Sequence, residues 1–207
     1  MKNFLKKLFL KLIPDKLILI KGNDKNTVYL SFDDGPYDDC IVKIVDILNE
    51  NKIPATFFLN GESILKFPDI IKKIIKNGGS IGNHSFSHFR PTNFNFIKSF
   101  NEIKLTNNAI KTITNNQCRI YRPPYGKLTI SDFLYAVYNN FKIVLWSYDS
   151  KDSFAQCFEE IENTLNNITG GDILLFHNDS KLTANNLNKI INIIDKKGFN
   201  FGLIIDI

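Results

Sequence analysis

Cysteine is scarce in this sequence, and the few cysteines are badly spaced for a structural role. Cys40, Cys118 and Cys157 are the only three, and no two of them form a CxxC pair. An odd and scattered set excludes both a disulfide framework and a cysteine-based zinc site. Cys40 and Cys157 fall within stretches of apolar periodicity, so we expect buried free thiols at both positions.

Clustered positive charge and linker-like composition are also absent. The 26 Lys and Arg exceed the 21 Asp and Glu, but the lysines are dispersed and no long basic block follows the first dozen residues. Nucleic-acid-binding proteins need clustered basic residues with a reading element, so we exclude that class. No repeat, low-complexity tract or Pro/Gly-rich linker divides the chain, which predicts one domain over residues 25–207.

The sequence has no apolar run long enough to span a bilayer. Lysines interrupt the apolar residues every few positions near the N-terminus, which also excludes the apolar core of a secretory signal. The spacing of Phe4, Leu5, Leu8 and Leu12 predicts one apolar helical face with lysines opposite. We therefore interpret residues 1–24 as a basic amphipathic segment that precedes the domain.

Two roles are open for this segment. Residues 1–13 could associate weakly with a membrane surface, or they could pack on the domain as a short helix. In the absence of a signal peptide, we expect the protein in the cytoplasm or at the inner membrane surface.

Apolar residues are plentiful, at 43% of the chain, and their spacing alternates between two periods. Short apolar runs are the candidate strands 28–32, 55–60, 80–83, 119–122, 142–146, 173–176 and 201–205. Between them, helical spacing predicts helices over 40–49, 68–76, 96–113, 131–139, 154–167 and 184–197. Strands that alternate with helices indicate an α/β fold with a parallel sheet. Seven strands suffice for a barrel, but periodicity does not distinguish a barrel from an open, doubly wound sheet.

Two adjacent carboxylates, Asp33 and Asp34, follow the first candidate strand, where Gly35 and Pro36 predict a turn. Neighbouring side chains at a strand end point in different directions. One carboxylate can therefore bind a metal ion while the other faces a bound water molecule. Taken alone the signal is weak, because Asp, Gly and Pro are common turn residues.

Histidine is rare, and its three positions are informative. His84 and His88 are four residues apart, a spacing that places two imidazoles on one face of a helical turn and lets them ligate one ion. Taken alone, the pair is equally well explained as surface or capping residues. His177 is the third histidine, and all three follow candidate strands. This is the edge at which barrel and α/β enzymes build their sites.

More charged residues follow other candidate strands. Arg122 is one of only three arginines in a lysine-rich chain, and its planar guanidinium can hold a carboxylate in one orientation. Asp149 and Asp152 follow the strand that ends at Trp146. Asp152 is placed to hydrogen-bond His177 and raise its pKa, whereas Asp149 could simply cap the next helix.

Five short motifs together resemble the polysaccharide deacetylases, the NodB-homology family also called carbohydrate esterase family 4. In chain order they are SFDDGP (31–36), HSFSH (84–88), RPPY (122–125), DSKD (149–152) and LFH (175–177). Each motif alone is modest, but five in order are specific. The resemblance implies a distorted (β/α) barrel of about seven parallel strands.

The resemblance also implies a role for each motif residue. Asp34, His84 and His88 would bind one divalent metal ion, zinc in the first place, with cobalt or nickel as alternatives. Asp33 would be the general base, oriented by Arg122.

The other roles concern the leaving group and the acyl group. His177 would be the general acid, with Asp152 beside it. The backbone N–H of Tyr125 would stabilise the oxyanion, and Leu175 would line the pocket for the acetyl methyl group.

The implied activity is metal-dependent removal of N-acetyl groups from the amino sugars of a poly- or oligosaccharide. One departure from the family pattern concerns substrate preference, because Ser153 stands where a tryptophan usually follows the acidic residue. Two alternatives therefore remain at this point. One is a deacylase of a lipid-linked amino sugar, and the other is a catalytically silent glycan-binding module.

Overall fold

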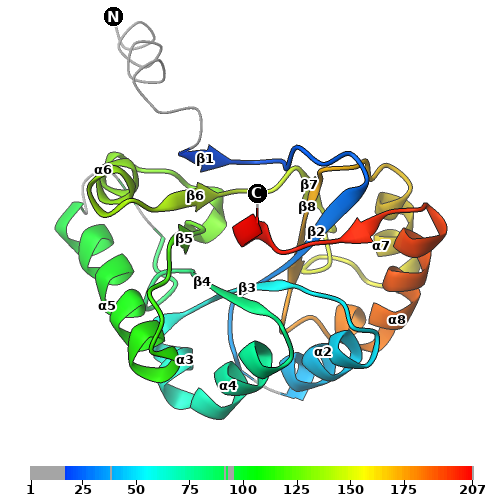
Figure 1. Ribbon diagram of the computed structural model, residues 1–207, viewed down its shortest axis with the longest axis horizontal. Coiled ribbons are helices and arrows are strands. Elements are labelled where there is room, and N and C mark those ends of the chain that lie inside the picture. Colours follow the sequence, from blue (N-terminus) through cyan, green and yellow to red (C-terminus); the bar gives the residue numbers. More distant parts are fainter. Residues whose placement is uncertain (1–16, 38, 91, 93–95, 207) are drawn as a thin grey trace, which may run out of the picture.

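The chain folds as one curled, mostly parallel β-sheet surrounded by helices (Figure 1). The structure, a computed structural model, describes residues 17–206 except 38, 91 and 93–95. Residues 1–16 of the predicted amphipathic segment (1–24) lie outside the described residues, and so does the membrane association predicted for residues 1–13.

Within the described residues the sheet holds nine strands, and eight of them follow one path. In the order of that path they are β1 (Ile18–Leu19), β6 (Lys142–Val144), β5 (Ile120–Tyr121), β4 (Ser80–Asn83), β3 (Thr56–Leu59), β2 (Thr27–Asp33), β8 (Ile173–His177) and β7 (Tyr148–Asp149). The ninth, β9 (Asn200–Phe201), pairs with the start of β2. All strand pairs are parallel, so the carboxyl ends of the strands lie at one end of the barrel.

Among the residues that the structure describes, no strand pairing closes the barrel, because β1 and β7 are the two ends of the path. We call the gap between these two strands the seam. The chain crosses it between β6 and β7, where Leu145 donates its N–H to Leu19 and Ser147 donates to Ile173. Next to the start of β8, an antiparallel bridge joins Lys21, which follows β1, to Asp172.

The longest strands are buried on both faces, as expected for a parallel sheet covered by helices. In β2 every residue after Thr27 is buried, and β3 is buried throughout. The rings of Phe32, Phe57 and Phe176 pack against one another on neighbouring strands, with centroid distances of 5.2 and 5.8 Å from Phe32. All three rings belong to the hydrophobic core.

Helices follow most strands and cover the sheet (Figure 1). They are α2 (Asp39–Glu50), α3 (Gly61–Lys66), α4 (Pro68–Lys76), α5 (Phe96–Thr114), α6 (Ile130–Asn139), α7 (Phe158–Leu165) and α8 (Lys181–Lys196). Local sequence sets several of their starts. Pro68 occupies the first turn of α4, and Thr129 and Asp132 form a reciprocal capping box at the start of α6.

The C-terminal segment covers the amino-terminal end of the barrel. After β9 the chain forms a short 3-10 helix (η2, Ile204–Asp206), in which Ile204 is fully buried and donates its N–H to the Thr56 hydroxyl. In Figure 1 the C-terminus accordingly lies over the centre of the ring of strands. The predicted strand over 201–205 is therefore wrong beyond residue 201, because these residues plug the barrel instead of extending the sheet.

The predicted distorted (β/α) barrel is confirmed, and each of the seven predicted strands overlaps an observed one. Three short elements were missed: β1, β7 and α3. The helix predicted over 154–167 begins only at Phe158, because residues 150–157 form a turn beside the cleft. The sheet also begins before residue 25, where we placed the start of the domain.

Two other expectations concern cysteine and membranes. Cys157 is exposed and Cys40 is half-buried, so the predicted burial of these thiols is wrong, whereas Cys118 is buried. Among the described residues, no helix has the length and apolarity needed to cross a bilayer.

Candidate active site

A cleft of about 690 Å³ opens at the carboxyl ends of the strands. All the predicted site residues except Arg122 line it, and Arg122 lies buried directly beneath. Asp33 and His177 end the paired strands β2 and β8 and are register partners, so the sheet places them side by side. The structure thus brings all five sequence motifs to one site.

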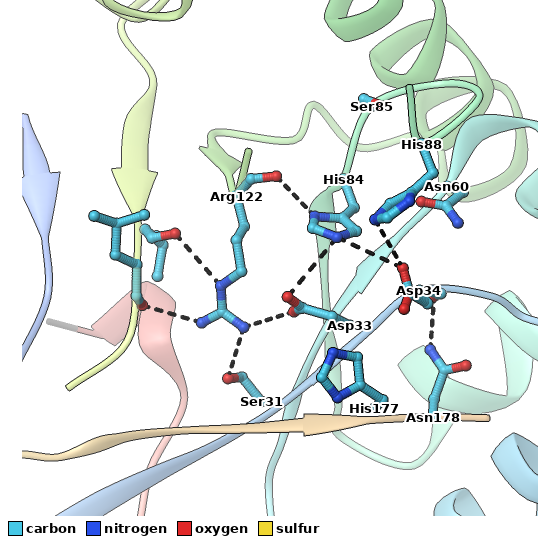
Figure 2. Close-up of polar contacts among 12 residues, drawn as sticks. Ser31, Asp33, Asp34, Asn60, His84, Ser85, His88, Arg122, His177 and Asn178 are labelled. Carbon is cyan, nitrogen blue, oxygen red and sulfur yellow. Dashed lines mark hydrogen bonds and ion pairs between the residues drawn. The ribbon is translucent and has the colours of Figure 1, made fainter. Parts of the chain in front are cut away.

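Arg122 is fully buried inside the barrel and holds Asp33 (Figure 2). Its Nη1 donates to Asp33 Oδ1 at 2.6 Å and to the Ser31 hydroxyl at 2.9 Å, while Nη2 donates to the Leu145 carbonyl at 3.1 Å. The guanidinium also lies 4.1 Å from the ring centroid of Phe58. The predicted pairing of Arg122 with a carboxylate is present, but only Nη1 contacts Asp33. The hydrogen bond from Nη2 to the backbone holds the guanidinium in place.

One ligand atom each from Asp34, His84 and His88 lies within 4.8 Å of the others. His88 Nε2 is 3.1 Å and His84 Nε2 is 3.7 Å from Asp34 Oδ1. That carboxylate oxygen is buried and accepts no hydrogen bond, which leaves it available to a cation. His84 Nδ1 donates to the Arg122 carbonyl at 2.8 Å, so Nε2 keeps its lone pair for an ion. The residues present therefore fit a divalent metal ion, with one carboxylate and two imidazole donors.

Burial sets the protonation of these donors. It raises the pKa of Asp34 to about 7, with the neighbouring Asp33 charge adding to the effect. Burial also lowers the pKa of His84 to about 4 and lowers that of His88. Neutral imidazoles beside a carboxylate that lacks a counter-charge are the state in which a cation binds best.

The two histidines do not lie on a helical turn, so that part of the prediction is wrong. Residues 84–88 form a loop in which Ser85 and His88 have left-handed backbone, with φ of 66° and 53°. Glu102 on α5 holds the loop, because one carboxylate oxygen accepts the N–H groups of Phe86 and Ser87 and the other accepts the Ser87 hydroxyl. These backbone contacts replace the helical hydrogen bonds that would otherwise position the pair.

The opposite wall of the cleft carries a hydrogen-bonded histidine. His177 Nδ1 donates to Asp152 Oδ1 at 2.8 Å, and the other Asp152 oxygen accepts from the His177 N–H and from the Thr183 hydroxyl. Burial would lower the pKa of His177, but the Asp152 hydrogen bond and charge outweigh it and raise the pKa to about 9. The predicted effect of Asp152 on His177 is thus present. Ser153 adds a hydroxyl 2.7 Å from the same Nδ1.

The remaining predicted residues are found at the rim and floor of the cleft. Tyr125 has left-handed backbone, with φ of 59°, and its ring packs 4.9 Å from that of His88. Leu175 is buried on β8 and lines the cleft, as does Trp146 after β6. Asp149 caps no helix and instead accepts from the Lys151 N–H and pairs with its ammonium.

Sequence reasoning missed three polar residues that support the site. Besides Glu102 and Thr183, these include Asn178, which donates to the Asp34 carbonyl from its side chain and to the Asp33 carbonyl from its backbone. Asn178 directly follows His177, so its position after a strand was a usable signal. The other two are helical residues and belong to none of the five motifs.

Comparison with known proteins bears on the chemistry of this cleft. Residues 20–145 match the family model described as polysaccharide deacetylase. Two relatives from Bacillus cereus are both named peptidoglycan-N-acetylglucosamine deacetylase. One is 35% identical over 86% of this chain and 66% of its own length, and the other is 31% identical over 86% of each.

A solved structure gives the same result in three dimensions. It is a peptidoglycan N-acetylglucosamine deacetylase in complex with a naphthyl-substituted N-oxidanyl-benzamide, and it is 32% identical over 91% of each chain with a TM-score of 0.84. The motifs, the fold and these matches agree, so the chain belongs to the polysaccharide deacetylase family.

Proposed function

We propose that this protein hydrolyses the N-acetyl groups of amino sugars in a poly- or oligosaccharide, with one divalent metal ion held by Asp34, His84 and His88. The observation that carries the proposal is that a proton acceptor, Asp33, and a proton donor, His177, both lie beside the three candidate metal ligands. Asp33 is fixed by Arg122, and His177 has a pKa raised to about 9 by Asp152. Binding alone would need neither group.

When bound, the ion supplies a positive charge that lowers the pKa of a water molecule and polarises the amide carbonyl. Zinc is the proposed identity, with cobalt or nickel as alternatives, because imidazole and carboxylate ligands suit these ions.

Asp33 accepts the proton of the attacking water molecule. Arg122 occupies its Oδ1 at 2.6 Å, while its Oδ2 lies 3.8 Å from His84 Nε2 and faces the metal ligands. The arginine therefore aims the second oxygen at the place where water would be activated. As the water oxygen bonds to the carbonyl carbon, the backbone N–H of Tyr125 donates to the developing oxyanion.

His177 supplies the proton that the leaving amine needs. Its Nδ1 proton is committed to Asp152, so Nε2 donates to the sugar nitrogen as the C–N bond breaks. Acetate and a free amino sugar are the products. Leu175 at the cleft floor is the proposed contact for the acetyl methyl group.

The relatives named as peptidoglycan-N-acetylglucosamine deacetylases favour an N-acetylglucosamine-containing glycan as substrate. The usual tryptophan of the fourth motif is replaced by Ser153. Trp146, the only tryptophan in the chain, lines the same cleft from a different strand end. We propose that Trp146 supplies the apolar wall that Ser153 lacks.

Ser153 also favours a second candidate function, deacylation of a lipid-linked amino sugar. A pocket with a serine at this position can admit an acyl group or an amino sugar of different shape, as in a lipid-linked substrate. Acyl release that requires a lipid-linked sugar would favour this candidate.

The test is acetate release from N-acetylglucosamine oligomers by zinc-loaded protein, run beside Asp33→Asn and His84→Ala. We expect Asp33→Asn to lose at least about 10²–10⁴-fold in turnover while still binding one zinc. His84→Ala should lose both turnover and zinc, measured by calorimetry. A fully active Asp33→Asn protein would overturn the role of the base. No release by zinc-loaded parent protein would overturn the substrate assignment.

A further inference from the structure

The outward faces of α5 and α6 expose no carboxylate, although both helices contain one. Glu102 on α5 is buried against the loop of the metal ligands, and Asp132 on α6 is buried in its capping box. The exposed charges on these helices, among the described residues, are Lys98, Lys104 and Lys111 on α5. None of the three forms an ion pair with a described carboxylate.

The same faces are unusually apolar. On α6 the exposed large side chains include Leu134, Val137 and Tyr138, and the Tyr138 side chain is 86% exposed. On α5 they include Ile97, at 75%, and Leu105. The two helices pack against each other and lie on one side of the barrel (Figure 1). We refer to these exposed residues and the three lysines as the α5–α6 face.

Other helices that cover the barrel differ in charge. α2, α4, α7 and α8 each expose at least one carboxylate. Examples are Glu50, Asp69, Glu159 and Asp195. The combination of exposed apolar side chains and lysines without an exposed carboxylate therefore distinguishes the α5–α6 face from these four helices.

The amino-terminal sequence continues the same chemistry. The described chain begins at Leu17, next to β1, and β1 pairs with β6, the strand that follows α6. Before that point, residues 1–14 carry four lysines among apolar residues and no carboxylate. The chain thus enters the fold beside the α5–α6 face with a basic, apolar sequence.

We propose that the α5–α6 face binds the surface of a bilayer with anionic headgroups. The free energy falls when apolar side chains enter the boundary between headgroups and acyl chains, and also when lysines approach anionic lipid. An exposed carboxylate would be repelled by the same headgroups, and neither helix exposes one, since Glu102 and Asp132 are both buried. The inference does not depend on the proposed deacetylase activity.

Sedimentation of the full chain with vesicles tests this inference. The vesicles are phosphatidylcholine alone or with about one-third phosphatidylglycerol, in low and high salt. We expect binding only to the anionic vesicles, and weaker binding in high salt. Replacing Val137 and Tyr138 together by Glu should weaken binding at least about tenfold, since it adds repelled charge where apolar contact is lost. Lys104→Ala and Lys111→Ala should each weaken it about fivefold.

A matched control is the double change of Leu65 and Ile75 to Glu, at exposed apolar positions on α3 and α4. This variant should bind like the parent. The inference is overturned if the parent ignores anionic vesicles, or if the Val137 and Tyr138 variant binds as tightly as the parent. It is also overturned if light scattering shows a dimer of the parent that the same variant dissociates, because a second copy then covers the face.

Discussion

Two histidines of the same cleft have pKa values moved in opposite directions by their surroundings. Burial lowers the pKa of His84 to about 4, whereas the Asp152 contact leaves His177 with a pKa of about 9. A neutral imidazole can ligate a metal ion, and a protonated one can act as an acid. The surroundings of each ring thus favour the role proposed for it, His84 as a metal ligand and His177 as an acid.

Asp152→Asn tests this at His177. Without the carboxylate, burial dominates and the His177 pKa should fall to or below its ordinary value of about 6.5. Turnover of the parent should decline as pH rises through about 9, and the decline should move at least about two pH units lower in the variant. A pH profile of kcat for both proteins measures this shift. A decline at the same pH in the variant and the parent would contradict the role of Asp152.

The same pair links stability to pH. Because the folded pKa of His177 is raised, its contribution to stability is fully present below about pH 6.5 and is lost as pH rises through about 9. The difference in unfolding free energy between the parent and Asp152→Asn should therefore shrink over that interval, as chemical denaturation at several pH values would show.

Arg122→Gln tests the buried ion pair with Asp33. The change leaves a carboxylate inside the barrel without its partner, and we expect the free energy of unfolding to fall by about 3–5 kcal/mol. Denaturant titration measures this. Arg119→Gln is the matched control, because Arg119 is exposed and directly precedes β5, the strand that Arg122 follows. This variant should have nearly the stability of the parent.

At the level of elements, helix α5 holds the loop of residues 84–88 in place, a role that its sequence pattern does not predict. Glu102 accepts three hydrogen bonds from the loop that carries His84 and His88, from the buried face of a 19-residue helix. An acidic residue within a helix predicts a solvated position, so neither pattern nor motif could identify it. The contact exists only once α5 packs beside β4.

Glu102→Ala should loosen the loop without altering the proposed metal ligands themselves. We expect zinc affinity to fall about 10–100-fold, as for other residues that orient ligands, together with a loss of stability. Calorimetric zinc titration of the variant measures it. Glu162→Ala, at an exposed position on α7, is the control and should bind zinc like the parent; equal affinity of both variants would contradict the positioning role.

Longer elements were predictable because their apolar spacing is unambiguous. α2 places Ile41, Ile44, Val45 and Leu48 on one face, and β2 is a continuous run of strand-forming residues. β1 and β7 have only two residues each, too few for any periodicity, and exist because neighbouring strands pair with them. The candidate site residues were predictable for another reason, because the five motifs lie at strand ends. Glu102 and Thr183, which hydrogen-bond to the site, lie within helices and outside every motif.

For the molecule as a whole, the two ends of the barrel have different tasks. The carboxyl ends of the strands form the cleft, and the amino ends are covered by the C-terminal segment with Ile204 at its centre. Stability and chemistry are thus placed at opposite ends, as in other barrels.

Ile204→Ala should therefore destabilise the fold and spare the site. Removing a buried isoleucine side chain costs about 2–5 kcal/mol, and the cleft lies at the other end of the barrel. Thermal unfolding and acetate release at a low temperature measure the two effects. The adjacent Ile205→Ala is the control, since Ile205 is 53% exposed and should change neither; a large activity loss in Ile204→Ala at full folding would contradict the separation.

The seam has a consequence for how such an enzyme can change over evolutionary time. In a barrel closed by pairing, strand number, tilt and stagger must agree all the way round, so altering one edge disturbs every neighbour. Here β7 is a free edge, and the turn that follows it, including Ser153, forms one wall of the cleft. Residues in that turn can be exchanged, gained or lost without shifting the register of the other strands. Selectivity for the sugar can thus diverge at the seam while the candidate site residues at the carboxyl ends of β2, β4 and β8 stay in place.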